Sequence, residues 1–295
     1  DWKAHKELAA IISEFEPDLI HSHTFKAGAL VRFGAVKVPI VHSFHGHHLY
    51  DPEFGFFKRS LLNAVERRLA KKSSALITIG NRVRDELLAV GIGEPNQYLS
   101  IAPGIQALDL GNRDAIRNKF GISKDAKVVL WLGRFTEVKR PDRVVEIAKE
   151  LPEFTFVMAG GGESLDSVKS TAPKNVLMLG VQDKNEMWSI ADLGLCTSDS
   201  EGMPLSLIEA QMAGVPVVST DVGSVSEIVQ DGVTGFLAPR NSKELAKQIA
   251  LAFTGNSLTK MGNAAQVRAK SLFTAEVMVN AHIELYKKTL DKVAR

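Results

Sequence analysis

Short runs of hydrophobic residues alternate with amphipathic, helix-like segments along almost the whole chain. Most of the runs are β-branched or Leu-rich and lack strict alternation of polar and apolar positions, which is typical of strands buried on both faces. Helical patterns separate nearly all of them, and such a βαβα order predicts parallel sheets with helices on both sides. The predicted strands are residues 18–22, 39–44, 75–79, 98–102, 127–132, 154–159, 175–179, 192–197, 215–219 and 235–238.

A polar stretch at residues 106–127 divides this pattern and marks the predicted domain boundary. The length of 295 residues agrees with two domains of about 150 residues each. We therefore predict two α/β domains, residues 1–108 and 109–273, followed by a helix at residues 274–295.

The composition is that of an ordinary globular protein, with 45% hydrophobic and 24% charged residues. A net charge of +2 is too close to zero to indicate nucleic-acid binding. No apolar run reaches the roughly 18 residues of a membrane span, and the charged, amphipathic start does not resemble a signal peptide. Cys196 is the only cysteine, which excludes an intrachain disulfide and a multi-cysteine metal site and favours a reducing cytoplasm.

A glycine and two cations follow the predicted strand at residues 127–132, where ligands of parallel sheets bind. Gly133 permits a tight turn, and Arg134 and Lys139 lie five residues apart on the loop. A guanidinium and an ammonium at fixed positions can bind a diphosphate. A solvated basic loop is an equally good interpretation of this spacing alone.

Two carboxylates follow the predicted strand at residues 192–197. Glu201 and Gly202 lie on the loop, and Pro204 begins a helix whose free N–H groups and dipole can hold an anion. Glu209 lies on the second turn of that helix. Both carboxylates can accept hydrogen bonds from hydroxyl groups of a sugar or a ribose. The alternative for Glu209 is a charge on the helix surface, which its mostly apolar neighbours disfavour.

Histidines gather after the predicted strand at residues 39–44. His45 lies at the strand end beside Gly46, and we expect its side chain to face a ligand cleft. His21 and His23 follow another apolar run, and their spacing places both on one face of a strand. A metal site is the minor alternative, because no Asp or Glu lies among these histidines and Gly46 breaks any helix that would align them. We interpret the other histidines as polar residues at strand ends: His42, His47 and His48.

Gly160, Gly161 and Gly162 follow the predicted strand at residues 154–159. They resemble a phosphate-binding loop only loosely, because Leu165 replaces the last glycine of Gly-x-Gly-x-x-Gly. We interpret the segment as a permissive turn beside the cleft.

Taken together, the carboxylates and the cation loop resemble those of the retaining glycosyltransferases of family 4. Glu201 and Glu209 match the E-x7-E motif of that family, and Gly133-Arg134 with Lys139 match its cation loop. Further matches extend over nearly the whole chain, at residues 17–23, 41–46, 214–218 and 231–237 and at Gly223 with Glu227. The resemblance implies an α/β protein of GT-B type, with two Rossmann-like parallel-sheet domains facing a cleft and a last helix that crosses back to the first domain.

The resemblance implies how the chain would bind the donor diphosphate and the sugar. Arg134 and Lys139 would bind the diphosphate and stabilise it as it leaves, and Leu205 would offer its N–H to the same group. His45 would lie near the anomeric carbon and the acceptor. The donor sugar would be held by one carboxylate and by backbone groups of the three residues that follow it: Glu201, Gly202, Met203 and Pro204.

The same resemblance implies the nucleotide and the reaction. Glu209 would hold the ribose hydroxyls, and Val181 would contact the base through its main chain. UDP is the family's commonest nucleotide, ahead of GDP and ADP, so a UDP-sugar is the expected donor. The reaction would be retaining transfer of a hexose-type sugar to a glycan or lipid-linked acceptor, in cell-surface polysaccharide or glycolipid synthesis. GT-B enzymes usually need no divalent metal or cofactor, and Arg134 with Lys139 would take the metal's place.

One departure from the family concerns the first domain. The family normally has a further strand, a Gly-rich loop and additional βα units before the strand predicted at residues 18–22. We therefore expect the first domain to be incomplete at its start. The chain is then a fragment, is completed by a partner, or is catalytically weak.

Residues 54–72 form a basic, amphipathic segment. Phe57, Leu61, Val65 and Leu69 recur every four residues, and we expect this stripe to pack on the sheet with the cations solvated. The alternative is peripheral contact with the inner face of an anionic membrane that holds a lipid-linked acceptor.

Two other functions compete with glycosyl transfer. Sugar-nucleotide epimerases can share the GT-B architecture, but the E-x7-E motif and the few carboxylates near His45 argue against them. A non-catalytic or weakly catalytic module that binds sugar nucleotides is the third interpretation. Product analysis separates the three, as transfer, interconversion or binding without turnover.

Overall fold

The computed structural model describes residues 2–34, 36–46 and 55–292, and the chain divides into two compact units. Unit 1 consists of Asp1–Gly104 and Ala275–Arg295, and unit 2 consists of Ile105–Thr274. The boundary between Gly104 and Ile105 lies slightly before the predicted boundary at residue 108. Ile105 already belongs to unit 2, because its N–H donates to the carbonyl of Phe273 at 2.9 Å.

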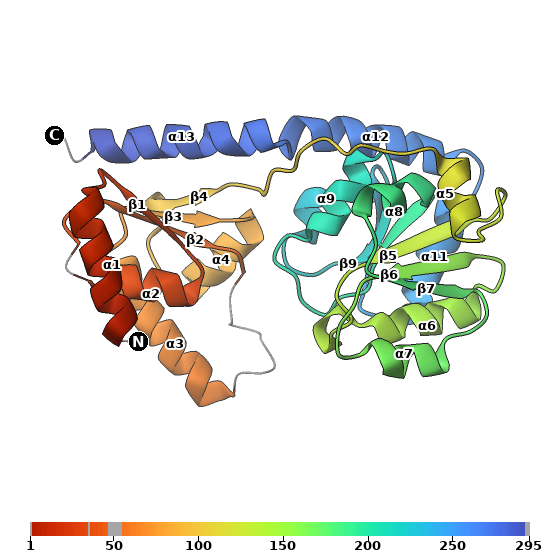
Figure 1. Ribbon diagram of the computed structural model, residues 1–295, viewed down its shortest axis with the longest axis horizontal. Helices are drawn as coiled ribbons and strands as arrows, with labels where there is room; N and C mark the ends of the chain where they lie inside the picture. The colour runs from red at the N-terminus through yellow and green to blue at the C-terminus, as the bar shows by residue number, and fades with distance from the viewer. Residues whose placement is uncertain (1, 35, 47–54, 293–295) are drawn as a thin grey trace. The chain divides into compact units, whose positions relative to one another are not determined.

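Unit 1 is built on a parallel sheet with the strand order β1-β2-β3-β4. Its strands are β1 (Ile20–His23), β2 (Ile40–Phe44), β3 (Ala75–Thr78) and β4 (Tyr98–Ser100). Its helices are α1 (Trp2–Phe15), α2 (Phe25–Phe33), α3 (Phe56–Ala70), α4 (Asn81–Ala89), the 3-10 turn η2 (Pro95–Gln97) and α13 (Ala275–Asp291). Figure 1 shows α13 on one face of the sheet and α2 with α3 on the other. Every residue of β2 is buried, as expected for a strand covered on both faces.

The core of unit 1 joins segments from both ends of the chain. Val41, Ile77 and Ile101 of the sheet region pack against Leu285 of α13. On the opposite face, Arg32 of α2 forms a buried, two-pronged ion pair with Glu66 of α3, both N–O distances being 2.9 Å. The apolar contacts fix α13 to the sheet, and the ion pair joins α2 to α3.

The hydrophobic stripe of α3 departs from the prediction that it packs on the sheet. Leu69 is fully buried, but Leu61 is exposed and Phe57 is 88% exposed. The prediction is wrong for the first turns of the helix because they extend away from the sheet, and only the last turns reach the core (Figure 1).

Unit 2 contains a six-stranded parallel sheet with the order β10-β9-β8-β5-β6-β7. Its strands are β5 (Val128–Leu132), β6 (Thr155–Ala159), β7 (Val176–Gly180), β8 (Leu193–Cys196), β9 (Val217–Thr220) and β10 (Gly235–Ala238). Its helices are α5 (Arg113–Lys119), α6 (Pro141–Glu150), α7 (Leu165–Thr171), α8 (Lys184–Ile190), α9 (Leu205–Met212), α10 (Val225–Ile228), α11 (Ser242–Ala252) and α12 (Ser257–Leu272), with the 3-10 turn η3 (Glu137–Lys139). The chain starts in the middle of the sheet and winds outward twice, in opposite directions, which is the Rossmann strand order.

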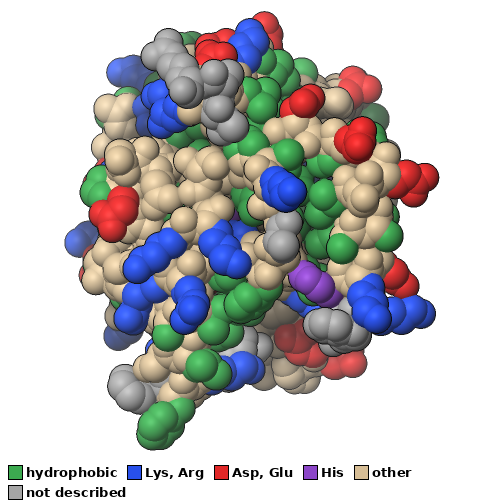
Figure 2. All heavy atoms as spheres, turned by 90° about the vertical axis from the view of Figure 1, so that its left-hand side faces the viewer, with side chains coloured by type: hydrophobic (Ala, Val, Ile, Leu, Met, Phe, Trp, Pro, Cys, Tyr) green, Lys and Arg blue, Asp and Glu red, His purple; other side chains and the backbone are tan. Residues whose placement is uncertain are grey.

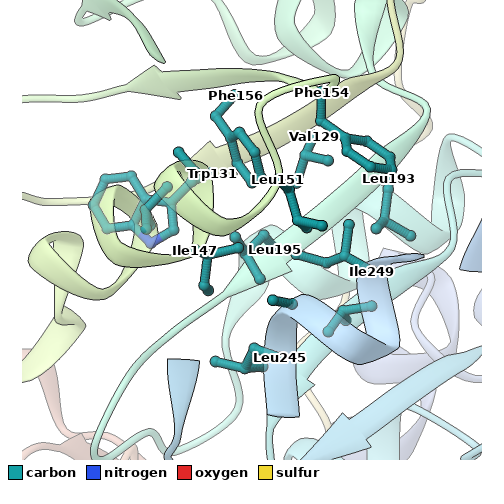
Figure 3. Close-up of a cluster of buried hydrophobic side chains, with 14 of the residues drawn as sticks. Val129, Trp131, Ile147, Leu151, Phe154, Phe156, Leu193, Leu195, Leu245 and Ile249 are labelled. Atoms are coloured by element: carbon teal, nitrogen blue, oxygen red, sulfur yellow. The ribbon is translucent and has the colours of Figure 1, made fainter. Parts of the chain in front are cut away.

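The main core of unit 2 lies between this sheet and helices α6 and α11 (Figure 3). Val129 and Leu195 of the central strands meet Ile147 of α6 and Leu245 and Ile249 of α11. Burial of each such side chain contributes about 1.5–3 kcal/mol. This layer holds the central strands rigidly, and the loops at their carboxyl ends are therefore well positioned.

The predicted α/β class and all ten predicted strands are confirmed, each strand beginning and ending within two residues of its predicted bounds. The prediction succeeds because fully buried parallel strands are continuous apolar runs. Within the described part of the chain, no helix combines the length and the hydrophobicity needed to cross a bilayer.

Candidate functional site

The carboxyl ends of β5 and β8 mark the point in unit 2 where the winding of the sheet reverses. β5 leads to β6 and β7 on one side, and its other neighbour β8 leads to β9 and β10. In open parallel sheets, ligands bind outside the strand ends at such a point. The loop after β5 carries the predicted cations, and the loop after β8 with the helix that follows it carries the predicted carboxylates, so both sets follow neighbouring strands.

The loop after β5 is tied to the end of β8. The Thr197 hydroxyl lies 2.9 and 3.0 Å from the carbonyl oxygens of Lys139 and Arg140. Arg140 and Arg143 also form ion pairs with Asp199, at 3.0 and 2.9 Å. The backbone of Arg140 is left-handed, with φ of 51°, which is uncommon for a residue other than glycine and turns the chain into α6. The position of Lys139 is therefore well determined.

Arg134 lies on the same loop and its side chain is exposed, with no ion-pair partner among the residues that the structure describes. The turn that carries it depends on neighbouring glycines. A Cβ on Gly160 would lie 1.8 Å from the carbonyl oxygen of Gly133, and one on Gly162 would lie 2.5 Å from that of Phe135. The glycine-rich turn interpreted as permissive thus has a definite role, because it lets two loop backbones cross closely.

The Glu201 carboxylate lies in direct contact with the Lys139 ammonium. Lys139 Nζ is 2.5 Å from Glu201 Oε1, and the Ser198 hydroxyl donates to the same oxygen at 2.6 Å. The Glu201 side chain is only 8% exposed, so these are partly desolvated, charge-assisted hydrogen bonds. Two groups with different predicted roles, one for a diphosphate and one for a sugar, are paired with each other.

Gly223 allows the Glu201 loop to adopt its conformation. Its φ is 52°, and a Cβ there would lie 1.7 Å from the carbonyl oxygen of Glu201. The N–H of Ser224 donates to the carbonyl of Gly202 at 2.8 Å, and Met203 is buried beneath the loop. The backbone from Glu201 onward is therefore held from behind by the loop after β9.

Helix α9 starts directly after this loop. Pro204 occupies the N-cap position and its side chain provides no capping hydrogen bond. The first N–H groups of a helix have no acceptor within the helix, and together with the helix dipole they attract anions. Leu205 is the first helical residue, and 49% of its surface is exposed.

Glu209 lies on α9 and is buried, its side chain 10% exposed, so the alternative of a surface charge is wrong. Lys184 Nζ lies 2.8 Å from Glu209 Oε1, and Trp188 Nε1 donates to Oε2 at 3.3 Å. Val181 lies just before α8, after the left-handed Gly180, and is 80% exposed. The residue predicted to contact a base is therefore exposed, after the carboxyl end of β7.

His45 belongs to unit 1, at the end of β2. Its Nε2 lies 2.9 Å from Nδ1 of His23, and the two rings stack with centroids 5.1 Å apart. His21 lies next to His23. Its Nε2 is 2.7 Å from the Ser43 hydroxyl, and its Nδ1 is 2.6 Å from the hydroxyl of Tyr286 on α13. As their spacing predicts, His21 and His23 lie on one face, with ring centroids 4.2 Å apart.

The three imidazoles have lowered pKa values, although His23 and His45 are exposed. Desolvation, and then the proximity of His23, lower the pKa of His21 to about 4. Desolvation is also the main cause that lowers the pKa of His23 and of His45 below the usual value. Neutral rings can both donate and accept, so the His23–His45 hydrogen bond requires no charge.

His42 is fully buried within β2 rather than at a strand end. Its Nδ1 lies 3.0 Å from the Ser22 hydroxyl, whereas its Nε2 has no partner among the described residues. Desolvation, and then the charge of Arg32, lower its pKa to about 3. His47 and His48 lie outside the described residues. Across residues 2–34, 36–46 and 55–292, no group of three or more His, Cys, Asp or Glu side chains has an arrangement that could hold a metal ion.

Several side chains at these places were not predicted. Ser198 lies two residues after the end of β8, so its position after a buried strand was a usable signal. The sequence signal for Lys184 and Trp188 is weaker: Asp183 before them is a typical N-cap residue of a helix that follows a strand. Tyr286 lies 265 residues from His21 in sequence and offers no local signal.

The fold and the site define a class of two-domain protein in which a Rossmann-like unit presents cations, carboxylates and a helix start at the switch point of its sheet. Residues 112–268 match the family described as glycosyl transferases group 1, and residues 1–104 match the glycosyl transferase 4-like domain. The chain therefore belongs to the glycosyl transferases group 1 family and has the GT-B fold.

Two curated proteins show the range of its relatives. The D-inositol 3-phosphate glycosyltransferase of Mycobacteroides abscessus is 30% identical over 254 residues, which cover 77% of this chain and 56% of that protein. A Klebsiella pneumoniae protein named "uncharacterized 41.2 kDa protein in cps region" is 26% identical over 286 residues, covering 92% of this chain and 78% of the relative. The chain thus spans about half the length of the inositol phosphate enzymes that it matches.

Solved structures share the fold at lower sequence identity. Sucrose-phosphate synthase from Thermosynechococcus elongatus superposes with a TM-score of 0.88 at 19% identity, covering 98% of this chain and 78% of the other. HepE of Anabaena, in complex with UDP, gives a TM-score of 0.86 at 23% identity, covering 95% and 81%.

Proposed function

We propose that this chain catalyses retaining transfer of a hexose-type sugar from a nucleotide-sugar, with UDP as the expected nucleotide, to a glycan or lipid-linked acceptor. The observation that carries the proposal is the meeting of a cation and a carboxylate at the switch point of unit 2, where Lys139 Nζ lies 2.5 Å from Glu201 Oε1. A nucleotide-sugar presents a diphosphate between two sets of hydroxyl groups. Cations can bind the diphosphate, and carboxylates can accept hydrogen bonds from the hydroxyl groups.

The proposed reaction uses these groups to stabilise the leaving diphosphate. As the bond from the anomeric carbon to the phosphate oxygen breaks, its electron pair and the negative charge move to the diphosphate. Arg134, Lys139 and the N–H groups at the start of α9 stabilise this charge, which is usually the largest contribution to such a rate. The acceptor hydroxyl attacks the same face of the sugar, and its proton passes to the departing phosphate oxygen. With two cations in place, the proposed reaction requires no divalent metal.

The carboxylates hold the two ends of the donor in this proposal. Glu209 binds the ribose hydroxyls, and the main chain of the exposed residue Val181 contacts the base. Glu201 and the backbone of residues 202–204 bind the sugar. His45 of unit 1, whose pKa is lowered by desolvation, provides a hydrogen bond near the anomeric carbon or the acceptor.

The comparisons support this choice of donor and reaction. HepE has been solved with UDP, with UDP and glucose, and with UDP-glucose. The relatives named D-inositol 3-phosphate glycosyltransferase support glycosyl transfer as the type of reaction. Synthesis of a cell-surface polysaccharide or glycolipid in the cytoplasm is the corresponding proposal for the process.

For a lipid-linked acceptor, we propose contact of α3 with an anionic membrane surface. Phe57 and Leu61 are exposed on the first turns of α3, and Lys58, Arg67 and Arg68 on the same helix are exposed cations. Hydrophobic side chains and Lys or Arg side chains appear together in the lower part of Figure 2. Exposed apolar side chains among cations suit an anionic lipid surface. Flotation with anionic vesicles at low salt tests this contact, and no flotation, or equal flotation of Phe57→Ser, would contradict it.

Calorimetry with UDP, GDP and ADP, each with and without a hexose, tests the donor site. We expect saturable binding of one nucleotide, UDP first, and its loss in Glu209→Ala. Product analysis with the matching nucleotide-sugar and a hydroxyl acceptor should then yield a glycoside with the anomeric configuration of the donor. Binding of none of the three nucleotides would contradict the proposal, and interconversion of the sugar without transfer would contradict the reaction.

A further inference from the structure

We infer that Lys184 positions Glu209 for the ribose of the nucleotide and so determines how strongly the site prefers ribose over 2′-deoxyribose. The inference rests on the proposed function, in which Glu209 receives the ribose hydroxyls. It assigns a role to a residue of α8 that lies outside the cation loop and outside the loop and helix that carry the two carboxylates.

Each oxygen of the Glu209 carboxylate has its own donor. Lys184 Nζ lies 2.8 Å from Oε1, and Trp188 Nε1 donates to Oε2 at 3.3 Å. The terminal torsion of a glutamate has a broad energy profile, so an unbound carboxylate would rotate over a wide range. Two donors on different oxygens remove this freedom. A carboxylate has about four acceptor positions, so each oxygen keeps one for the two neighbouring hydroxyls of a ribose.

Both donors come from one short helix. Lys184 and Trp188 are four residues apart on α8 and therefore lie on the same face. The start of α8 is fixed by the Asp183 side chain, which accepts hydrogen bonds from the N–H groups of Asn185 and Glu186 at 2.8 and 3.1 Å. This capped turn sets the position of the Lys184 backbone, from which the side chain reaches Glu209.

The two donors differ in burial and therefore in their contribution to folding stability. Trp188 is almost fully buried and belongs to the interior of unit 2, so its replacement would disturb packing. The Lys184 side chain is 48% exposed, whereas that of Glu209 is 10% exposed. A half-exposed ion pair contributes little to folding stability. Loss of the Lys184 ammonium should therefore leave the fold intact and change the orientation of the carboxylate.

A matched control lies on the same helix. Lys119 pairs with Glu186 of α8 at 2.7 Å, and the Lys119 side chain is 54% exposed. Lys119→Met removes an ion pair from α8 as Lys184→Met does, but away from Glu209. A general effect of a lost ion pair on α8 would change nucleotide binding in both variants. An effect that acts through Glu209 would change it only in Lys184→Met.

The test compares the dissociation constants of UDP and 2′-deoxy-UDP, or of GDP or ADP and its 2′-deoxy form where that nucleotide binds best. We expect the unaltered chain to prefer the ribonucleotide about tenfold or more, because an unpaired polar group in a buried site discriminates strongly. Lys184→Met should reduce this preference to about threefold or less, mainly by weakening ribonucleotide binding. Lys184→Arg should restore most of it, because a guanidinium also donates to a carboxylate, and Lys119→Met should leave it unchanged.

The outcomes separate the inference from the proposed function. An unchanged ribose preference in Lys184→Met, with Glu209→Gln losing it, would overturn the role of Lys184 and leave the donor site standing. An equal loss in Lys119→Met would overturn it as well. Failure of the unaltered chain to bind any of the three nucleotides would contradict the proposed function itself.

Discussion

Lys139 and Glu201 contact each other directly, with Nζ 2.5 Å from Oε1, although they come from loops after two different strands. The ammonium belongs to the proposed diphosphate subsite and the carboxylate to the proposed sugar subsite. A bound diphosphate would attract the ammonium, and the carboxylate would then be available to a sugar hydroxyl. Under the proposed function, the contact would couple the two subsites, so that filling the first prepares the second.

This coupling predicts opposite effects of Glu201→Gln on UDP and on a UDP-sugar. Without the carboxylate, Lys139 has no competing anion, so UDP should bind equally well or up to about tenfold more tightly. Turnover of the UDP-sugar should fall about 100-fold, because a charged hydrogen bond to the sugar is lost. Calorimetry and initial rates measure the two effects, and Glu137→Gln, which removes an exposed charge from the same cation loop, is the control. Weaker UDP binding by Glu201→Gln would exclude the coupling.

Lys139→Ala and Glu209→Ala should each lower turnover by orders of magnitude while the chain folds normally. The first removes a cation from the leaving diphosphate, and the second removes the acceptor for the ribose. Circular dichroism melting curves verify the fold, and a radiolabelled donor measures transfer. A rate near that of the unaltered protein in either variant is incompatible with the proposed donor site.

The fold was predictable because the strands of both sheets are continuous apolar runs separated by helices. The strand order was not, since no local pattern says that β5 and β8 are neighbours. The loops that carry Arg134 and Glu201 could be chosen because they follow strands, whereas their meeting at one place depends on that order. The ion pair of Lys139 with Glu201 depends further on side-chain conformations, which spacing does not determine.

Two misjudged features show where periodicity is insufficient. The spacing of Phe57 and Leu61 is that of a buried stripe, but the helix extends past the sheet, so tertiary position overrides the pattern. His42 follows the alternation of a strand, yet its burial depends on α2, where Gly28 leaves just enough space for the ring. In both cases the placement of one element against another decides burial, and the local pattern does not.

Gly223→Ala should destabilise the chain and weaken sugar binding more than Gly232→Ala. Both glycines have left-handed backbones, with φ of 52° and 72°, so alanine costs about 1–2 kcal/mol at each. A Cβ on Gly223 would in addition lie 1.7 Å from the carbonyl oxygen of Glu201, whereas one on Gly232 meets nothing within 4 Å. Melting temperatures and the dissociation constant of a UDP-sugar measure the difference, and equal values for the two variants would refute the role of Gly223.

The histidines of unit 1 predict a loss of stability as the pH falls. The pKa of His21 is lowered to about 4 and that of His42 to about 3, in each case mainly by burial, whereas unfolded histidine has a pKa of about 6.5. Below about pH 6.5 the unfolded chain binds protons that the folded chain does not, so the free energy of unfolding decreases as the pH falls toward these lowered values. Stability from these groups is therefore complete above that pH and is lost on acidification.

Amide hydrogen exchange of β2 peptides between pH 7 and pH 4.5, corrected for the intrinsic pH dependence of exchange, measures this loss locally. His21→Gln removes one titrating group and should flatten the decline in protection with falling pH. Tyr286→Phe removes the hydrogen bond to His21 but no imidazole, so it should lower protection at every pH and leave the decline as steep. Because lost packing acts equally at all pH values, the slope isolates titration from structural damage. An equally steep decline in His21→Gln and in the unaltered chain would show that this buried imidazole does not contribute to the acid sensitivity of unit 1.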